Sequence, residues 1–248
     1  MILSVVVYGA LCTFFTYAAA KYPSELPQCH AGDTKCLPEV ITGILSGYPN
    51  GHPGLAIPPL EPLRINSIDI VQGAESPINI DLHLKNLDLN GISKAVITKV
   101  VGFEEDILNS KFEIYAKLPQ LSLHGDYKIN GRVLVLPIQG VGKSSLNFEN
   151  FDIGIKYKPK IIIKNGKEYI QTEKFKLEFD TSKFSLHFSD LFNGDKALGD
   201  NMNIFLNENW RDILNELKPS ITSTLEQILE AIINRIFAKV PYKEMYLH

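Results

Sequence analysis

Apolar and polar residues alternate with a period of two along most of the chain between residues 63 and 188. This alternation is typical of β-strands that bury one face and expose the other. The pairs Asn130-Gly131 and Asn165-Gly166 favour tight hairpin turns, so we expect neighbouring strands to be antiparallel. The inward phase is shared by Phe112, Ile114, Leu121, Leu123, Phe151, Ile153, Phe175, Leu177, Phe184 and Leu186.

The C-terminal part of the chain changes to the three- and four-residue spacing of one long amphipathic helix. Proline cannot donate a backbone hydrogen bond, so we expect a kink or restart at Pro219, between segments 200–217 and 219–239. The apolar stripe contains Trp210, Ile213, Leu214, Leu217, Ile221, Leu225, Ile228, Leu229, Ile232, Ile233, Ile236 and Phe237. The polar side contains Arg211, Asp212, Glu216, Lys218, Glu226, Gln227, Glu230, Asn234 and Arg235, which excludes a membrane span.

The only apolar surface that can cover this helix is the inward face of the strands. We therefore predict an α+β fold in which a highly curved antiparallel sheet wraps the long C-terminal helix and encloses a hydrophobic tunnel. The helix residues predicted to line the tunnel are Leu225, Ile228, Leu229 and Ile232. Tyr127 and Tyr157 also keep the inward phase, and their hydroxyls either bond to backbone or water or hold a ligand oxygen. The alternative is that these side chains fill a solid core.

Residues 1–20 carry no charged side chain and end in Ala18-Ala19-Ala20, which is the pattern of a signal peptide. We therefore expect residues 21–248 to form a single secreted domain. An N-terminal membrane anchor is the alternative. Cys29 and Cys36 are then the only cysteines left in an oxidising compartment, and we expect them to form a disulfide at the start of a short helix near residues 37–45 capped by Asp33. The proline-rich stretch 48–63 reads as an extended connector.

Residues with catalytic or metal-binding potential do not form a recognisable constellation. Gly140 to Ser144 resembles the end of a phosphate loop, but Pro137 stands where the first glycine is required. The six histidines are scattered, and His124 and His187 lie in phase with polar strand faces. We therefore expect no enzyme activity, no cofactor and no metal. The net charge of −3 argues against nucleic acid as a partner and makes membrane contact unfavourable.

Several motifs occur in an order that resembles the insect takeout proteins and the related haemolymph juvenile hormone binding proteins over nearly the whole chain after residue 20. They are the pair Cys29 and Cys36, the segment 54–63 (GLAIPPLEPL), Gly125-Asp126-Tyr127, the segment 136–142 (LPIQGVG), the segment 203–210 (NIFLNENW) and Pro241-Tyr242. The resemblance implies a curved sheet around a long helix, a tunnel for a lipid-like ligand, secretion and no catalysis. A single cysteine pair favours the takeout branch, and Glu61 replaces the aspartate expected before Pro62.

The leading hypothesis is a monomeric carrier in haemolymph or sensory fluid that binds a small hydrophobic ligand such as a terpenoid hormone, fatty acyl chain, quinone or odorant-like molecule. Burial of apolar ligand surface supplies enough free energy for such binding without many polar contacts. Two alternatives remain. One is a lipid-exchange protein that acts at membrane surfaces, and the other is an extracellular interaction module with a filled core.

Overall fold

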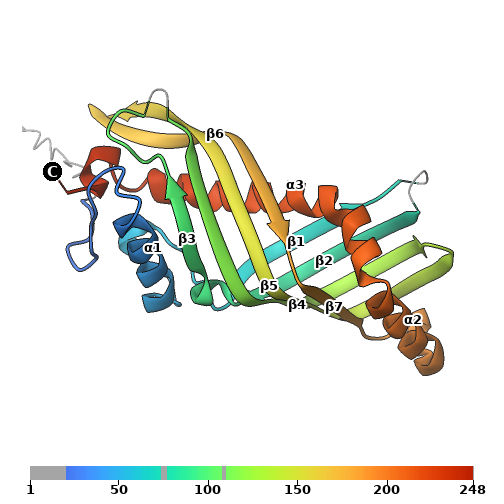
Figure 1. The fold of residues 1–248 in the computed structure, drawn as a ribbon. Coiled ribbons are helices and arrows are strands. Elements are labelled where there is room, and N and C mark those ends of the chain that lie inside the picture. The colour runs from blue at the N-terminus through green and yellow to red at the C-terminus, as the bar shows by residue number, and fades with distance from the viewer. Residues whose placement is uncertain (1–20, 74–76, 108–109, 248) are drawn as a thin grey trace, which may run out of the picture.

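The computed structural model describes residues 21–73, 77–107 and 110–247. It is an α+β structure in which a seven-stranded antiparallel sheet curls around a C-terminal helix without closing (Figure 1). The strands are β1 (Leu63–Val71), β2 (Ile78–Asn90), β3 (Val96–Val101), β4 (Phe112–Val133), β5 (Leu136–Lys164), β6 (Lys167–Asp180) and β7 (Lys183–Phe188). The helices are α1 (Cys36–Gly47), α2 (Lys196–Glu208) and α3 (Trp210–Phe237), with short 3-10 turns at Pro53–Leu55, Ile92–Lys94, Phe192–Gly194 and Tyr242–Met245. The predicted fold class is confirmed.

The two long central strands β4 and β5 divide the sheet into two wings. The first half of β4 pairs with β3 and the second half of β5 pairs with β6, which together form what we call the β6 wing. The second half of β4 pairs with β2, and the first half of β5 pairs with β7; with β1 these form the β2 wing. The β4–β5 ladder keeps its register across the unpaired position of Pro119 and Asn150, between the pairs Leu118–Phe151 and Gln120–Glu149. Asn150 has a positive φ of 49°.

The hairpin turns match the sequence in one case of two. Asn165-Gly166 forms the β5–β6 turn with both φ angles positive, as predicted. Asn130-Gly131 does not form a turn, because both residues lie inside β4 and pair with β5 and β2. A Cβ on Gly131 would lie 2.1 Å from the carbonyl oxygen of Asn79, so this glycine permits close strand approach. The β4–β5 turn is instead Leu134-Val135, between the paired residues Val133 and Leu136.

The C-terminal helix breaks earlier than predicted. The backbone leaves helical geometry at Asn209 (φ −105°, ψ 17°), whose side-chain amide donates to the carbonyl of Phe205 and so caps α2. The sequence predicted a kink or a restart at Pro219, and the helix does not restart there, because α3 continues through this residue. Both Pro219 and Asn215, the residue four positions earlier, are exposed, so water can satisfy the carbonyl that proline leaves without a donor. Figure 1 shows α3 changing direction between the arm that follows α2 and the arm that crosses the β6 wing.

Side chains of α2 and α3 form hydrogen bonds with groups on the edge strands of the sheet. Asn207 accepts from the backbone N–H of Leu186 and donates to its carbonyl, and Asn203 makes the same two bonds with Phe188. On the edge of β6, Glu226, Glu230 and Asn234 accept hydrogen bonds from the backbone N–H of Leu177, the hydroxyl of Thr172 and the backbone N–H of Thr172. The polar side of the helix identified from the sequence is therefore partly used for contacts with the sheet, through Glu226, Glu230 and Asn234. The i, i+4 spacing lets one helix row replace a neighbouring strand.

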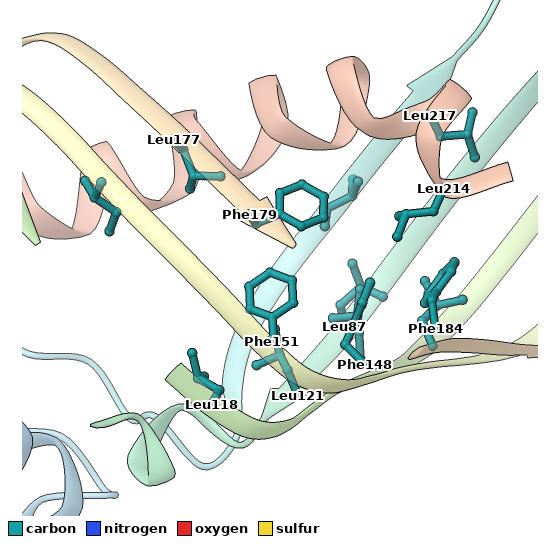
Figure 2. Packing of buried hydrophobic residues seen from close by; sticks show 14 of the residues in the cluster. Leu87, Leu118, Leu121, Phe148, Phe151, Leu177, Phe179, Phe184, Leu214 and Leu217 are labelled. Atoms are coloured by element: carbon teal, nitrogen blue, oxygen red, sulfur yellow. The ribbon is translucent and has the colours of Figure 1, made fainter. Parts of the chain in front are cut away.

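The predicted strand phases are confirmed by burial. Eight of the ten inward-phase strand residues are buried, and Ile114 and Ile153 are partly buried against the same core. Figure 2 shows Phe148 and Phe151 rising from the sheet, Leu177 and Phe179 on β6, and Leu214 and Leu217 of α3, all directed into one interior. His124 and His187 are exposed, as expected.

The N- and C-terminal segments are tied together at one end of the molecule. The predicted disulfide between Cys29 and Cys36 is present. The carbonyl of Cys29 accepts from the backbone N–H of Leu247, and Gln28 donates to the carbonyl of Glu244. Asp33 accepts from the N–H groups of Lys35 and Cys36 at the start of α1, which confirms its capping role. The predicted connector 48–63 has no regular structure apart from its 3-10 turn, an isolated bridge between His52 and Ile57, and Leu63, which begins β1. Among the described helices, none has the length and apolarity required to cross a bilayer.

Candidate ligand-binding site

The second arm of α3 presents an apolar stripe that the protein covers incompletely. The two ends of the helix are sealed, because Ile213, Leu214, Leu217 and Phe237 are buried. Between them, every apolar side chain of the stripe is only partly buried: Ile221, Leu225, Ile228, Leu229, Ile232, Ile233 and Ile236. A helix that packed fully against a sheet would bury such a stripe. The uncovered surface therefore marks the space in which an apolar ligand can replace missing protein contacts.

An apolar cavity lies between the first arm of α3 and the β2 wing. Its volume is about 50 Å³, and all of its lining side chains are hydrophobic. Its lining residues are Ile70, Ile78, Ile80, Leu82, Ile129, Val133, Ile138, Leu146, Phe184, Leu186, Phe188, Leu206, Ile213, Leu214, Leu217 and Ile221. Ile221 lines this cavity and is also the first residue of the partly buried stripe, so the two features meet at this residue.

The hydroxyl of Tyr127 is a structural group. It donates to the carbonyl of Ser189, and its ring packs against Phe188 with the ring centroids 4.7 Å apart. Burial raises the pKa of Tyr127 to about 12, and the charge of Asp190 acts in the same direction. The hydroxyl therefore stays protonated and holds β4 to the segment after β7. This is the backbone-bonded alternative that the sequence left open.

The hydroxyl of Tyr157 is buried and has no hydrogen-bond partner among the described residues. Its ring lies against those of Phe112, Phe175 and Phe237, with centroid distances of 5.6, 5.8 and 6.3 Å. Burial raises the pKa of Tyr157 well above its usual value, so the phenol is a neutral donor at physiological pH. A buried donor without an acceptor is costly, and an acceptor atom on a ligand would remove that cost. Because Phe237 is the last residue of α3, this donor lies at the C-terminal end of the stripe.

The predicted ligand-binding residues fall into separate groups. Phe184 and Leu186 line the apolar cavity, while Phe112, Tyr157 and Phe175 form the aromatic cluster near the end of α3. Phe151 packs with Phe148 and Phe179 between them. The other predicted strand residues, Ile114, Leu121, Leu123, Ile153 and Leu177, belong to the common core. Sequence reasoning missed Phe103, Tyr242 and Tyr246 of the cluster, because loop and terminal residues have no periodic signal.

A larger hollow of about 480 Å³ lies on the outside of the sheet and is an open groove. Its lining includes Lys128, Asn130, Gln139, Asp190 and Asn193. Charged and amide groups in open solvent offer an apolar molecule little gain on transfer from water. We therefore place the candidate site in the interior.

No group of at least three His, Cys, Asp or Glu residues capable of holding a metal ion occurs in the part of the chain that the structure describes. The exposed pair Asp69 and Asp81 contacts the two ring nitrogens of His83, at 2.6 and 2.9 Å. These contacts raise the pKa of His83, with the hydrogen bond to Asp69 contributing most. This cluster lies on the solvent side of β1 and β2, away from the apolar interior.

We expect Tyr157→Phe to leave the free energy of unfolding unchanged or slightly increased, because the substitution removes a buried hydroxyl that has no partner. Affinity for a fatty acid or quinone should fall by about fivefold or more through loss of one hydrogen bond, while affinity for a pure hydrocarbon should not. Chemical denaturation and ligand titration measure the two quantities. Tyr127→Phe is the matched control: it should lose about 1 kcal/mol of stability and keep its ligand affinity. Equal effects of both variants on affinity would contradict the assignment.

Comparison with known proteins gives a consistent set of matches. The family described as haemolymph juvenile hormone binding protein matches residues 4–247. The circadian clock-controlled protein daywake of Drosophila melanogaster is 25% identical over 234 residues, covering 92% of this chain and 90% of that protein. The daywake protein of Drosophila yakuba is 23% identical over 235 residues, with the same coverage. The crystal structure of Takeout 1 from Epiphyas postvittana superposes with a TM-score of 0.76 and 25% identity, covering 89% of this chain and 99% of that one.

Proposed function

Because this chain belongs to the haemolymph juvenile hormone binding protein family, we propose that it is a secreted, non-catalytic carrier of one small hydrophobic ligand. The observation that carries the proposal is the partly buried apolar stripe of α3 between Ile221 and Ile236. The structural likeness to Takeout 1 supports the same reading, since both chains share the curled sheet and long helix along nearly their whole length.

The size of the stripe indicates an elongated ligand. At about 1.5 Å per residue, the helix from Ile221 to Ile236 extends for about 22 Å. Covering about 400 Å² of apolar ligand surface contributes up to roughly 10 kcal/mol before the costs of association. Such a ligand binds with micromolar or tighter affinity without an extensive polar site.

The chemistry at one end of the stripe indicates a hydrogen-bond acceptor on the ligand. Tyr157 supplies a neutral donor beside Phe237, surrounded by aromatic rings. We infer an apolar chain or ring system that ends in a carbonyl, ester, epoxide or carboxyl oxygen. Terpenoid hormones, fatty acyl compounds and quinones meet this description. The family description names juvenile hormone, which is one member of this class.

The proposed setting is an extracellular fluid such as haemolymph or sensory fluid, with the protein acting as a monomer. The family description and the apolar N-terminal segment support secretion. The predicted signal peptide, residues 1–20, lies outside the described residues. The single domain 21–248 is part of the same proposal.

Titration of the delipidated protein with a fluorescent fatty acid tests the carrier proposal. We expect saturation at about one probe per chain with micromolar or tighter affinity, and displacement by unlabelled fatty acid or quinone. Absence of saturable binding would reject the carrier.

The small volume of the apolar cavity, about 50 Å³, favours a second candidate, an interaction module with a filled core. That candidate predicts no saturable binding of any apolar probe. It also predicts that larger side chains at the stripe lower stability, because no free space would receive them. The fatty-acid titration therefore separates the two candidates.

A further inference from the structure

The hairpin that joins β4 to β5 ends in an exposed apolar tip. Val135 is 82% exposed and Leu136 is 36% exposed at the turn, and Val141 on the same hairpin is 65% exposed. The neighbouring β1–β2 hairpin reaches the same end, because Ile78 pairs with Val133 (Figure 1). Val71 at the end of β1 is 64% exposed. Val71, Val135 and Leu136 therefore expose aliphatic side chains at one end of the molecule, while Val141 lies farther along β5.

The residues of this turn are not explained by turn chemistry. Two-residue hairpin turns favour asparagine and glycine, since their central residues adopt positive φ. The β5–β6 turn of this same chain follows the rule with Asn165-Gly166. The β4–β5 turn instead places Leu134 at φ 54°, a conformation unfavourable for a bulky side chain. Leu134 is partly buried against the core of the protein, which accounts for its apolar side chain. Val135 has no such burial, so its exposed side chain is the one that points to a contact outside the chain.

The charges on this hairpin all have one sign. From Tyr127 to Lys143 the charged residues are Lys128, Arg132 and Lys143, with no carboxylate. Lys143 contacts Asp126, and Lys128 shares the outer groove with Asp190. Arg132 lies nearest the tip, opposite Asn79 and Pro137, and forms no ion pair with any residue that the structure describes. The tip thus combines exposed aliphatic side chains with a cation that has no ion-pair partner among residues 21–73, 77–107 and 110–247, although the whole chain has a net charge of −3.

The inner face of the same hairpin contributes side chains to the apolar cavity. Ile129, Val133 and Ile138 line the apolar cavity, while Val135 and Leu136 lie exposed at its end. The exposed side chains of Val135 and Leu136 therefore adjoin hydrophobic side chains of the same hairpin that line the interior cavity.

We propose that the β4–β5 hairpin tip docks the protein on a phospholipid bilayer that contains anionic lipids. Val135 and Leu136 enter the interfacial region, and Arg132 contacts lipid phosphate or carboxylate groups. An anionic bilayer fits the tip because it supplies both an apolar layer and negative charge. The net charge of −3 makes membrane contact unfavourable for the chain as a whole, so the proposal depends on the local charge of the tip. The proposal goes beyond the carrier function, and docking is measured without a ligand.

Co-sedimentation with unilamellar vesicles tests the proposal, using phosphatidylcholine alone and phosphatidylcholine with about 30% phosphatidylserine, at low salt. We expect the full protein to bind the anionic vesicles and to dissociate as salt rises. Arg132→Glu should weaken binding by about fivefold or more, because it replaces a positive charge with a negative one. Val135→Glu should weaken binding by about tenfold, because a charged side chain does not insert into the apolar layer. Both positions are exposed, so the melting temperature should not change.

Two control variants lie in the β6 wing. Ile163 is 72% exposed near the β5–β6 turn, and Lys176 is exposed on β6, so Ile163→Glu and Lys176→Glu make the same chemical changes elsewhere. Both should bind anionic vesicles like the unmodified protein. The proposal is overturned if the unmodified protein does not bind these vesicles, if it binds neutral vesicles equally well, or if the controls lose as much binding as the tip variants. Failure of vesicle binding alongside intact fatty-acid binding would remove the docking proposal and leave the carrier function.

Discussion

Ile232→Trp is expected to lower affinity for a fluorescent fatty acid by at least about tenfold, which corresponds to ~1.4 kcal/mol. The melting temperature of the variant should stay close to that of the unmodified chain. Ile232 belongs to the partly buried stripe of α3 and is not part of the packed core. An indole at this position extends into the space assigned to the ligand. The substitution therefore competes with the ligand for volume and requires little rearrangement of the protein.

Leu84→Trp is the matched control for this prediction. Leu84 on β2 is 1% exposed, so the added volume has no space to occupy. Overpacking of this kind typically costs about 1–3 kcal/mol of stability. Thermal unfolding and probe titration on both variants distinguish the positions. A loss of stability at position 232 as large as that at position 84, with probe binding unchanged, would show that the stripe is not the ligand site.

Asn207→Leu is expected to destabilise the protein by about 2–4 kcal/mol, because two backbone groups of Leu186 lose their partner at once. Leu186 is buried on the edge strand β7, where water does not readily replace the lost bonds. Leucine has a higher helix propensity than asparagine, so the loss would not arise within α2 itself. Denaturant unfolding measures the difference.

Asn201→Leu separates edge bonding from a general effect on α2. Asn201 is exposed on the same helix, and its replacement should change stability by less than about 0.5 kcal/mol. Similar losses in the two variants would contradict the role assigned to Asn207 as a substitute for a neighbouring strand.

The period-two alternation predicted the strand phases because burial acts on every second residue of a strand, and eight of the ten predicted positions between Phe112 and Leu186 are buried. Turn positions were less certain, because a glycine can serve either a turn or a close strand approach. Gly131 serves the second purpose, and nothing local in the sequence distinguishes it from Gly166.

The helix pattern identified α3, but helical spacing alone does not reveal which polar side chains contact the protein. Glu226, Glu230 and Asn234 read as solvent-facing until the edge of β6 is placed beside them. The break lies at Asn209, whose side-chain amide donates a hydrogen bond to the carbonyl of Phe205 at the end of α2. Pro219 is exposed to solvent and lies within α3.

The apolar interior could be predicted, but its organisation could not. The sequence gives Tyr127 and Tyr157 the same phase, yet one hydroxyl reaches the carbonyl of Ser189 and the other reaches no acceptor among the described residues. That difference depends on where the segment after β7 crosses the sheet. Likewise, the apolar cavity lies against the first arm of α3, through Ile213 and Leu217, whereas the periodicity placed the channel on the second arm.

The claim that this protein carries a hydrophobic ligand is tested most directly by extracting the purified, secreted protein with organic solvent and analysing the extract by mass spectrometry. We predict one chemical class of apolar molecule bearing an oxygen acceptor, at about one per chain, strongly depleted in Ile232→Trp prepared in parallel. An extract without such a molecule, together with no saturable uptake of fatty acid or quinone by the same preparation, would contradict the carrier function.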